Sequence, residues 1–118
     1  MKKIRTFPSG ATRDIDIGKP DYEGFLCPLV LKRYGEYMNK HRKQSDGKIR
    51  DADNWQRGIS KDAYIKSAFR HFMDLWLEHR NYKSREGIED ALMALLFNIM
   101  GYAHELLKDK EVVHGRSL

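Results

Sequence analysis

Acidic side chains gather around one short polar segment in the second half of the chain. The group consists of one histidine and five carboxylates: His71, Asp74, Glu78, Glu86, Glu89 and Asp90. If the segments on either side are two helices of a hairpin, these side chains come into one small region. Like charges crowded together raise the free energy unless a cation or a proton offsets them. The pattern therefore predicts either a metal site or an ordinary solvated corner of the surface.

The carboxylates that precede the polar segment share one face of an expected helix. The apolar stripe of that helix consists of Ile65, Ala68, Phe69, Phe72 and Trp76. At the helical repeat, Asp74 and Glu78 project almost opposite this stripe. In the simpler interpretation both side chains face solvent, with Asp74 paired to Arg70 one turn earlier. In the functional interpretation they face a cleft and hold Mg²⁺ through their oxygens.

The carboxylates that follow the polar segment fall at the start of another helical pattern. Glu86 and Asp90 are one turn apart, and Glu89 lies to one side. The helix dipole alone accounts for Glu86, whereas Asp90 stands next to a nearly all-apolar run. Asn98 is the only strongly polar side chain inside that run. A buried Asn must be hydrogen-bonded, so Asn98 either fixes the helix register or contacts a ligand.

A tryptophan in a polar loop is the other unusual feature. Trp55 is accompanied by the cations Lys48, Arg50 and Arg57, which supply the positive charge that a triphosphate requires. Docking of the indole onto the helices is the first interpretation, and stacking on a nucleobase is the alternative.

Helical periodicity predicts the elements that position these residues. One helix is expected from Leu29 to His41, a second from an N-cap at Ser60 to about Tyr82, and a third from an N-cap at Ser84 to about Lys108. Residues 1–25 contain scattered Pro and Gly and predict an irregular N-terminal arm. Residues 109–118 predict a fraying tail. No segment shows convincing strand alternation.

The third expected helix carries the strongest prediction about packing. It is apolar nearly all round between Ala91 and Ala103, which a single covering partner cannot satisfy. We therefore expect an all-α fold, a bundle of three main helices with an irregular N-terminal arm. A second copy of the chain is expected to complete this bundle, which predicts a homo-oligomer. A length of 118 residues fits a single domain, residues 1–118.

Composition and charge narrow the functional classes. The chain is 41% hydrophobic and 33% charged, as in ordinary globular proteins, and its net charge of +5 favours anionic partners such as nucleotides. The single cysteine, Cys27, favours a reducing compartment. No segment has the pattern of a signal peptide or a membrane span, so we expect no membrane partner and a cytoplasmic location. Nucleic-acid binding is not expected, because the positive charge is spread along the chain without a recognised motif.

Four motifs, in order, resemble those of one family. They are SGATRD at 9–14, GKPDY at 18–22, NWQRGI at 54–59 and the pair Arg70-His71. The closing helix, with Asn98 followed by Ile99, is similar as well. Across roughly residues 8–107 the chain resembles the dATP/dGTP diphosphohydrolase N-terminal domain family, which is frequent in phages and prophages. That family is related to the MazG-like all-α nucleotide pyrophosphohydrolases.

The resemblance implies a helical, usually oligomeric enzyme that splits dATP or dGTP into the monophosphate and pyrophosphate with Mg²⁺. A phage-encoded protein of this kind would act in the host cytoplasm. Metal ligands map to Asp74, Glu78, Glu86, Glu89 and Asp90, with Glu78 as general base assisted by His71. Substrate-binding residues map to Lys19, Lys48, Arg50, Asn54, Trp55, Arg70 and Asn98.

Two alternatives belong to other functional classes. A domain of this fold can bind nucleotides without hydrolysing them, since fold does not fix function. The first alternative is therefore a non-catalytic nucleotide-binding or protein-interaction module, of viral origin, that engages a host factor. The second and weaker alternative is a basic DNA-binding domain.

Overall fold

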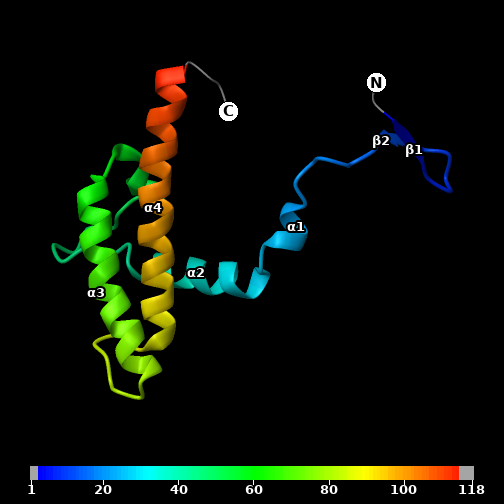
Figure 1. Cartoon of the computed structure of the whole chain (residues 1–118). Coiled ribbons are helices and arrows are strands. Elements are labelled where there is room, and N and C mark those ends of the chain that lie inside the picture. The colour runs from blue at the N-terminus through cyan, green and yellow to red at the C-terminus, as the bar shows by residue number, and fades with distance from the viewer. Residues whose placement is uncertain (1–2, 115–118) are drawn as a thin grey trace.

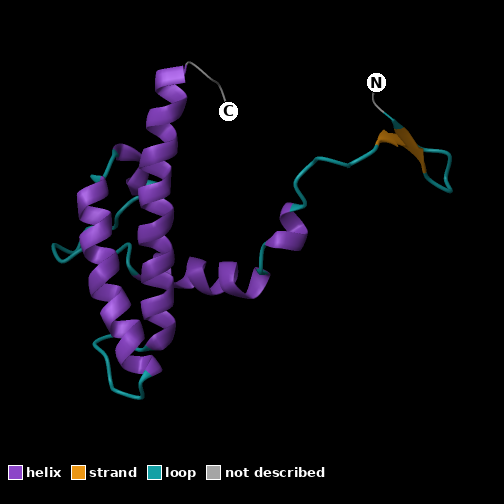
Figure 2. Cartoon of the chain, viewed as in Figure 1, coloured by secondary structure: helices purple, strands orange, loops and turns teal. Residues whose placement is uncertain are grey.

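The computed structural model describes residues 3–114, with side chains described through residue 110. The arm contains the strands β1 (Ile4–Thr6) and β2 (Thr12–Asp14) and the short helix α1 (Tyr22–Phe25). The helix α2 (Pro28–Lys40), the 3₁₀ helix η1 (Asn54–Arg57) and the helices α3 (Lys61–His79) and α4 (Ile88–His114) follow. Figure 2 shows that helices dominate the described chain, which confirms the predicted helical bundle with an N-terminal arm. Within residues 3–114, no helix combines the length and apolar character needed to cross a membrane.

The helices α3 and α4 form an antiparallel hairpin, and α2 meets it from one side (Figure 1). Ser60 caps α3 as predicted, its hydroxyl accepting a hydrogen bond from the Ala63 amide at 3.1 Å. The helix ends at His79, before the predicted Tyr82, because Asn81 adopts the left-handed φ of 66°. The helix α4 begins at Ile88, after the N-cap predicted at Ser84, because Gly87 adopts a left-handed φ of 83°. These two left-handed residues turn the chain between the helices.

The far end of α4 also differs from the prediction. The helix continues to His114, beyond the predicted Lys108, so residues 109–114 are helical rather than frayed. Residues 115–118 of the predicted tail lie outside the described residues. The sequence allows the helix to continue, because residues 109–114 contain neither Pro nor Gly and therefore no helix breaker.

Tight packing is concentrated where α4 meets α2 and α3. Tyr37 of α2 packs against Met93 and Ala94 of α4. Tyr64 of α3 is 2% exposed and crosses α4 at Gly101, where a Cβ would collide with its ring. Gly101 interrupts the apolar run in the sequence for this steric reason.

The arm contains a β-hairpin that periodicity did not predict. Its strands pair antiparallel with Arg5 opposite Arg13, and the Phe7 amide donates to the Ala11 carbonyl at 2.8 Å. Strands of three residues are too short to show alternation in a sequence. Figure 1 shows the arm extending away from the helical hairpin. The radius of gyration is accordingly 19.6 Å, whereas a compact chain of this length would have about 13–14 Å.

One broad face of the α3–α4 hairpin is apolar and exposed. On α3 it consists of Ile65, Phe69, Phe72 and Trp76, and on α4 of Ile88, Leu92, Ile99, Tyr102 and Leu106. On each helix, the apolar set is rotated about the helix axis by about a third of a turn from the side that contacts the other helix. Because the helices are antiparallel, this places both sets on the same side of the hairpin, opposite α2. We call this surface the bare face.

Candidate functional site

The polar face of α3 points inward, toward the turn and α4. Asp74 is 3% exposed, and His71 and Glu78 are half-buried. The apolar stripe of the same helix forms part of the bare face. The orientation is therefore the one that the functional interpretation required, and the simpler interpretation, with Asp74 facing solvent, is wrong. Buried carboxylates need partners, and the structure supplies them.

His71, Asp74 and Glu86 form a close cluster. The Nδ1 atom of His71 lies 2.6 Å from Oε1 of Glu86 and 3.9 Å from Oδ2 of Asp74. One possible ligand atom from each residue lies within 4.8 Å of the other two. Among the described residues, this is the one group of three or more His, Cys, Asp or Glu side chains that could hold a metal ion. His71 and Asp74 stand one turn apart on α3, and Glu86 comes from the turn before α4. The cluster therefore depends on the conformation of that turn.

Arg85 is the counter-ion of Asp74. Its Nε atom lies 3.1 and 3.0 Å from the two carboxylate oxygens, and its Nη2 atom lies 2.6 Å from Oδ2. These bonds hold the pKa of Asp74 below its ordinary value. Arg70, the partner that helical spacing predicted, contributes only its carbonyl, which accepts from Arg85 at 3.4 Å. Sequence periodicity could not find Arg85, because it approaches from another element.

Glu78 anchors the turn between the helices. Its Oε1 atom accepts hydrogen bonds from the amide and the hydroxyl of Ser84, at 3.1 and 3.0 Å. The Ser84 hydroxyl in turn accepts from the Gly87 amide at 2.9 Å. Ser84 therefore caps the turn rather than α4 itself. His71 contacts Glu86 and Asp74, so the expected partnership of His71 with Glu78 is replaced by one with Glu86.

Asp90 and Glu89 link α4 to α2 instead of joining the cluster. The two oxygens of Asp90 lie 2.6 Å from Arg33 Nη2 and 2.6 Å from Lys40 Nζ, and Glu89 lies 2.8 Å from Arg33 Nε. Lys40 and Arg33 lower the pKa of Asp90. The five carboxylates are thus divided among three sets of partners. The expected convergence holds for Asp74 and Glu86, while Glu78, Glu89 and Asp90 are engaged elsewhere.

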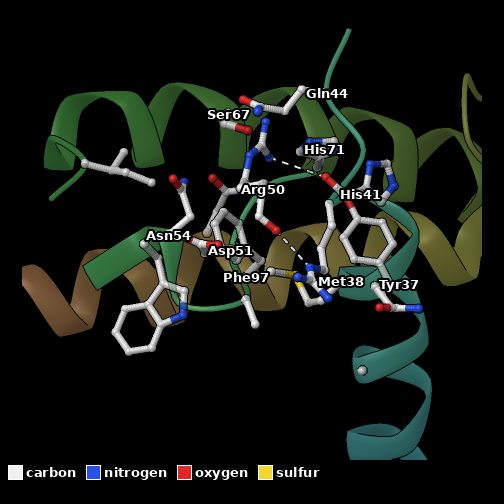
Figure 3. A pocket seen from close by; sticks show the side chains of 17 residues that line it. Tyr37, Met38, His41, Gln44, Arg50, Asp51, Asn54, Ser67, His71 and Phe97 are labelled. Carbon is white, nitrogen blue, oxygen red and sulfur yellow. Dashed lines mark hydrogen bonds between the residues drawn. The ribbon is translucent and has the colours of Figure 1, made fainter. Parts of the chain in front are cut away.

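A cavity of about 600 Å³ opens beside the cluster, between the end of α2, the loop before α3, and the inner faces of α3 and α4. His71 belongs to both the cluster and the cavity wall. Figure 3 shows Arg50, Asn54 and His71 around this space. Of the predicted substrate-binding residues, Arg50, Asn54, Trp55 and Asn98 line it. A volume of this size is typical of small-molecule sites.

The walls of this cavity combine two arginines, amides, several aromatic rings and one carboxylate, Asp51. Arg50 is held by its neighbours, its Nη1 donating to the His41 carbonyl at 3.4 Å and its carbonyl accepting from Arg42 Nε at 2.8 Å. Asn98, 4% exposed, donates through Nδ2 to the Ala94 carbonyl at 2.8 Å. Trp55 meets the ring of His104 edge-on, with centroids 4.7 Å apart. Trp55 therefore docks onto α4 and also lines the cavity.

Three predicted substrate-binding residues lie outside this cavity. Lys19 belongs to the arm, Lys48 to a tight turn in the loop after α2, and Arg70 to the exposed surface of α3. Conversely, the lining residues His41, Gln44 and Ser67 were not predicted as site residues. Only Ser67 had a local signal, because it precedes His71 by one helical turn.

The oxygen donors of the cluster fit Mg²⁺. This ion binds one or two protein carboxylates and completes its shell with waters and substrate phosphates. Asp74 and Glu86 provide two such carboxylates beside a cavity that contains cations for the remaining phosphate charge. Arg85 must leave Asp74 for an ion to bind there, because the guanidinium already occupies both oxygens.

Comparisons with protein-family models, with curated proteins and with solved structures found no match to this chain.

Proposed function

We propose that the protein is a Mg²⁺-dependent nucleotide pyrophosphohydrolase that converts a purine deoxynucleoside triphosphate, dATP or dGTP, to the monophosphate and pyrophosphate. The observation that carries this proposal is that His71 of the His71–Asp74–Glu86 cluster lines a cavity whose wall also contains Arg50 and Trp55. His71 would bring the cluster's carboxylates next to the reacting phosphate, Arg50 would offset the phosphate charge, and the indole and amides of the wall would contact the nucleoside.

Each member of the site has a separate proposed role. Asp74 and Glu86 would hold Mg²⁺, which when bound neutralises phosphate charge and activates water. His71, oriented by its 2.6 Å contact with Glu86, would take the proton from an attacking water. Arg50 would bind phosphate oxygens, and Asn54 and Asn98 would contact the nucleoside. Glu78 keeps the turn in place, so this assignment moves the base from Glu78 to His71.

A non-catalytic nucleotide-binding module is the second candidate, and the contact between Arg85 and Asp74 favours it. A guanidinium on both oxygens of Asp74 already neutralises the carboxylate that a metal would need. In such a module the cavity would bind nucleotide while the cluster stays closed, and the protein would act through a partner such as a host factor.

We also propose that a second copy covers the bare face. Large apolar side chains such as Phe69 and Phe72 are 69% and 50% exposed on α3, and contiguous apolar patches of this kind mark association surfaces. Packing two hairpins face to face would give a four-helix bundle around these stripes. A dimer is therefore part of the proposed function.

Incubation of the protein with each dNTP and Mg²⁺, followed by separation of the products, tests the proposal. Formation of the monophosphate with one equivalent of pyrophosphate supports the enzyme. Arg50→Ala should raise KM for dATP, whereas Arg80→Ala, which removes an arginine that lies over Trp76 outside the cavity wall, should leave it unchanged. Binding of dATP without turnover would favour the non-catalytic module, and release of phosphate alone would contradict a pyrophosphohydrolase.

A further inference from the structure

A second cavity lies next to the first and has a different chemical character. It also measures about 600 Å³ and is bounded by α2, the loop near η1 and the second half of α4. The two cavities share the lining residues Gly35, Met38, Ala52, Trp55 and Phe97. The rest of the second wall is almost entirely apolar or aromatic: Tyr34, Met100, Gly101, Ala103, His104 and Leu107. No Arg, Lys, Asp or Glu side chain lines it.

Gly35 stands where the two cavities meet, in the interior of α2. Glycine inside a helix lowers stability relative to alanine, so its presence calls for a local reason. At Gly101 the reason is packing, because a Cβ there would collide with Tyr64. At Gly35 a Cβ would meet no atom within 4 Å. The packing of the chain itself does not explain this glycine, which leaves the backbone of α2 open to the cavities.

We infer that the second cavity is the base subsite of the nucleotide site, where a planar purine ring lies over Gly35 beside Trp55, while the phosphates occupy the first cavity. This inference rests on the proposed nucleotide binding. The distribution of charged side chains supports this arrangement, since Arg42 and Arg50, together with Asp51, line the first cavity and no charged side chain lines the second. Aromatic and thioether side chains suit a base, which has an apolar face and polar edges. His104 and Tyr34 provide polar atoms for those edges.

A second copy of the chain fits this cavity less well than a base does. The bare face, where the second copy is proposed to pack, lies on the other side of the α3–α4 hairpin from α2. The second cavity is on the α2 side, because Tyr34, Gly35 and Met38 of α2 form its wall. Because the second cavity shares part of its wall with the first, it is continuous with the candidate site and not with the bare face.

The test is the substitution Gly35→Leu in the full chain, measured by calorimetric titration in Mg²⁺ with two probes, dATP and inorganic tripolyphosphate. The new side chain has room for its Cβ and raises helix propensity, so the variant should fold with an unchanged or higher melting temperature. We expect the affinity for dATP to fall at least tenfold and that for tripolyphosphate to change less than twofold. Glu36→Leu is the matched control, because it adds the same side chain to α2 outside both cavities and should leave both affinities unchanged.

Several outcomes would overturn the inference. Wild-type affinity of Gly35→Leu for dATP would exclude the base from the second cavity. An equal loss for both probes would show that the substitution disturbs the phosphate site instead of the base. If Gly35→Leu changed the oligomeric state in sedimentation but kept its affinity for dATP, the cavity would be a contact between two copies of the chain. If the wild-type protein binds dATP without turnover, the hydrolase proposal fails while the base subsite is still decided by Gly35→Leu; if it binds neither probe, both fail.

Discussion

The Nδ1 atom of His71 lies 2.6 Å from Oε1 of Glu86, although the two residues are 15 positions apart. The contact joins the inward face of α3 to the turn that precedes α4. It also fixes the orientation of the imidazole at the wall of the first cavity. A histidine oriented by a carboxylate is a common arrangement for proton transfer.

Replacing Glu86 should therefore affect turnover more than folding. Glu86→Gln keeps the size of the side chain but removes the charge that contacts His71 and that is proposed to bind metal. We expect kcat to fall about 100-fold or more, with little change in melting temperature. Glu89→Gln, which alters an exposed carboxylate outside the cluster, is the control and should retain activity. Equal losses in the two variants would contradict the assigned role.

Removing the Arg85 side chain should free Asp74 to bind the proposed Mg²⁺ ion. In Arg85→Ala the buried carboxylate of Asp74 loses its partner, so the metal-free protein should melt at a lower temperature. Mg²⁺ should then raise the melting temperature of the variant more than that of the wild type, because ligand stabilisation follows affinity. Arg80→Ala, which removes an arginine that lies over Trp76, is the control. Identical responses to Mg²⁺ would show that Arg85 does not compete with the ion.

Asp90 should stabilise the contact between α2 and α4 in a pH-dependent manner. Its pKa is lowered by Lys40 and Arg33, so its contribution is present above the unfolded pKa and is lost as pH falls through the folded one. Asp90→Asn should lower stability by about 1 kcal/mol at pH 7, and the difference from wild type should shrink below about pH 4. Urea unfolding of both proteins between pH 7 and pH 3 measures this. A constant difference across that range would argue against the ion pairs as its source.

Glu78 and Ser84 should act as one unit in the turn. Ser84→Ala removes the hydroxyl that donates to Glu78 and accepts from the Gly87 amide, which should lower stability by about 1 kcal/mol. Glu78→Gln weakens the same unit, so the double variant should lose less than the sum of the two single losses. Free energies of unfolding for the four proteins provide the cycle. Additive losses would show that the Ser84 hydroxyl and Glu78 are not coupled, leaving only the bond from the Ser84 amide to hold Glu78 in the turn.

Charge on the bare face should separate the proposed dimer. Phe72→Glu places a carboxylate in the middle of this apolar surface, where burial against a second copy would be unfavourable. The wild-type protein should sediment as a dimer at micromolar concentration, and the variant should sediment as a monomer. Ile17→Glu, at an exposed position of the arm, is the control and should remain dimeric. A monomeric wild-type protein would reject the proposed assembly outright.

Local chemistry in the sequence was sufficient to predict the three main helices, though not all of their ends, and part of the candidate site. Ser60 and the apolar spacing predicted α3, because capping and periodicity are properties of adjacent residues. Helical spacing also placed Asp74 and Glu78 opposite the apolar stripe. The loop containing Arg50 and Trp55 stood out by composition, and the structure places both residues at the cavity.

The tertiary structure decided which face of α3 turns inward and which cation meets each carboxylate. Periodicity identifies two faces but not the one that is covered, so the apolar stripe looked like core and proved to be the bare face. Arg33 and Asp90 are 57 positions apart, and Arg85 reaches Asp74 only through the turn between helices. Such pairings arise from contacts between elements, which spacing within one element does not encode. The division of the carboxylates, the two cavities and the open position at Gly35 therefore follow from packing alone.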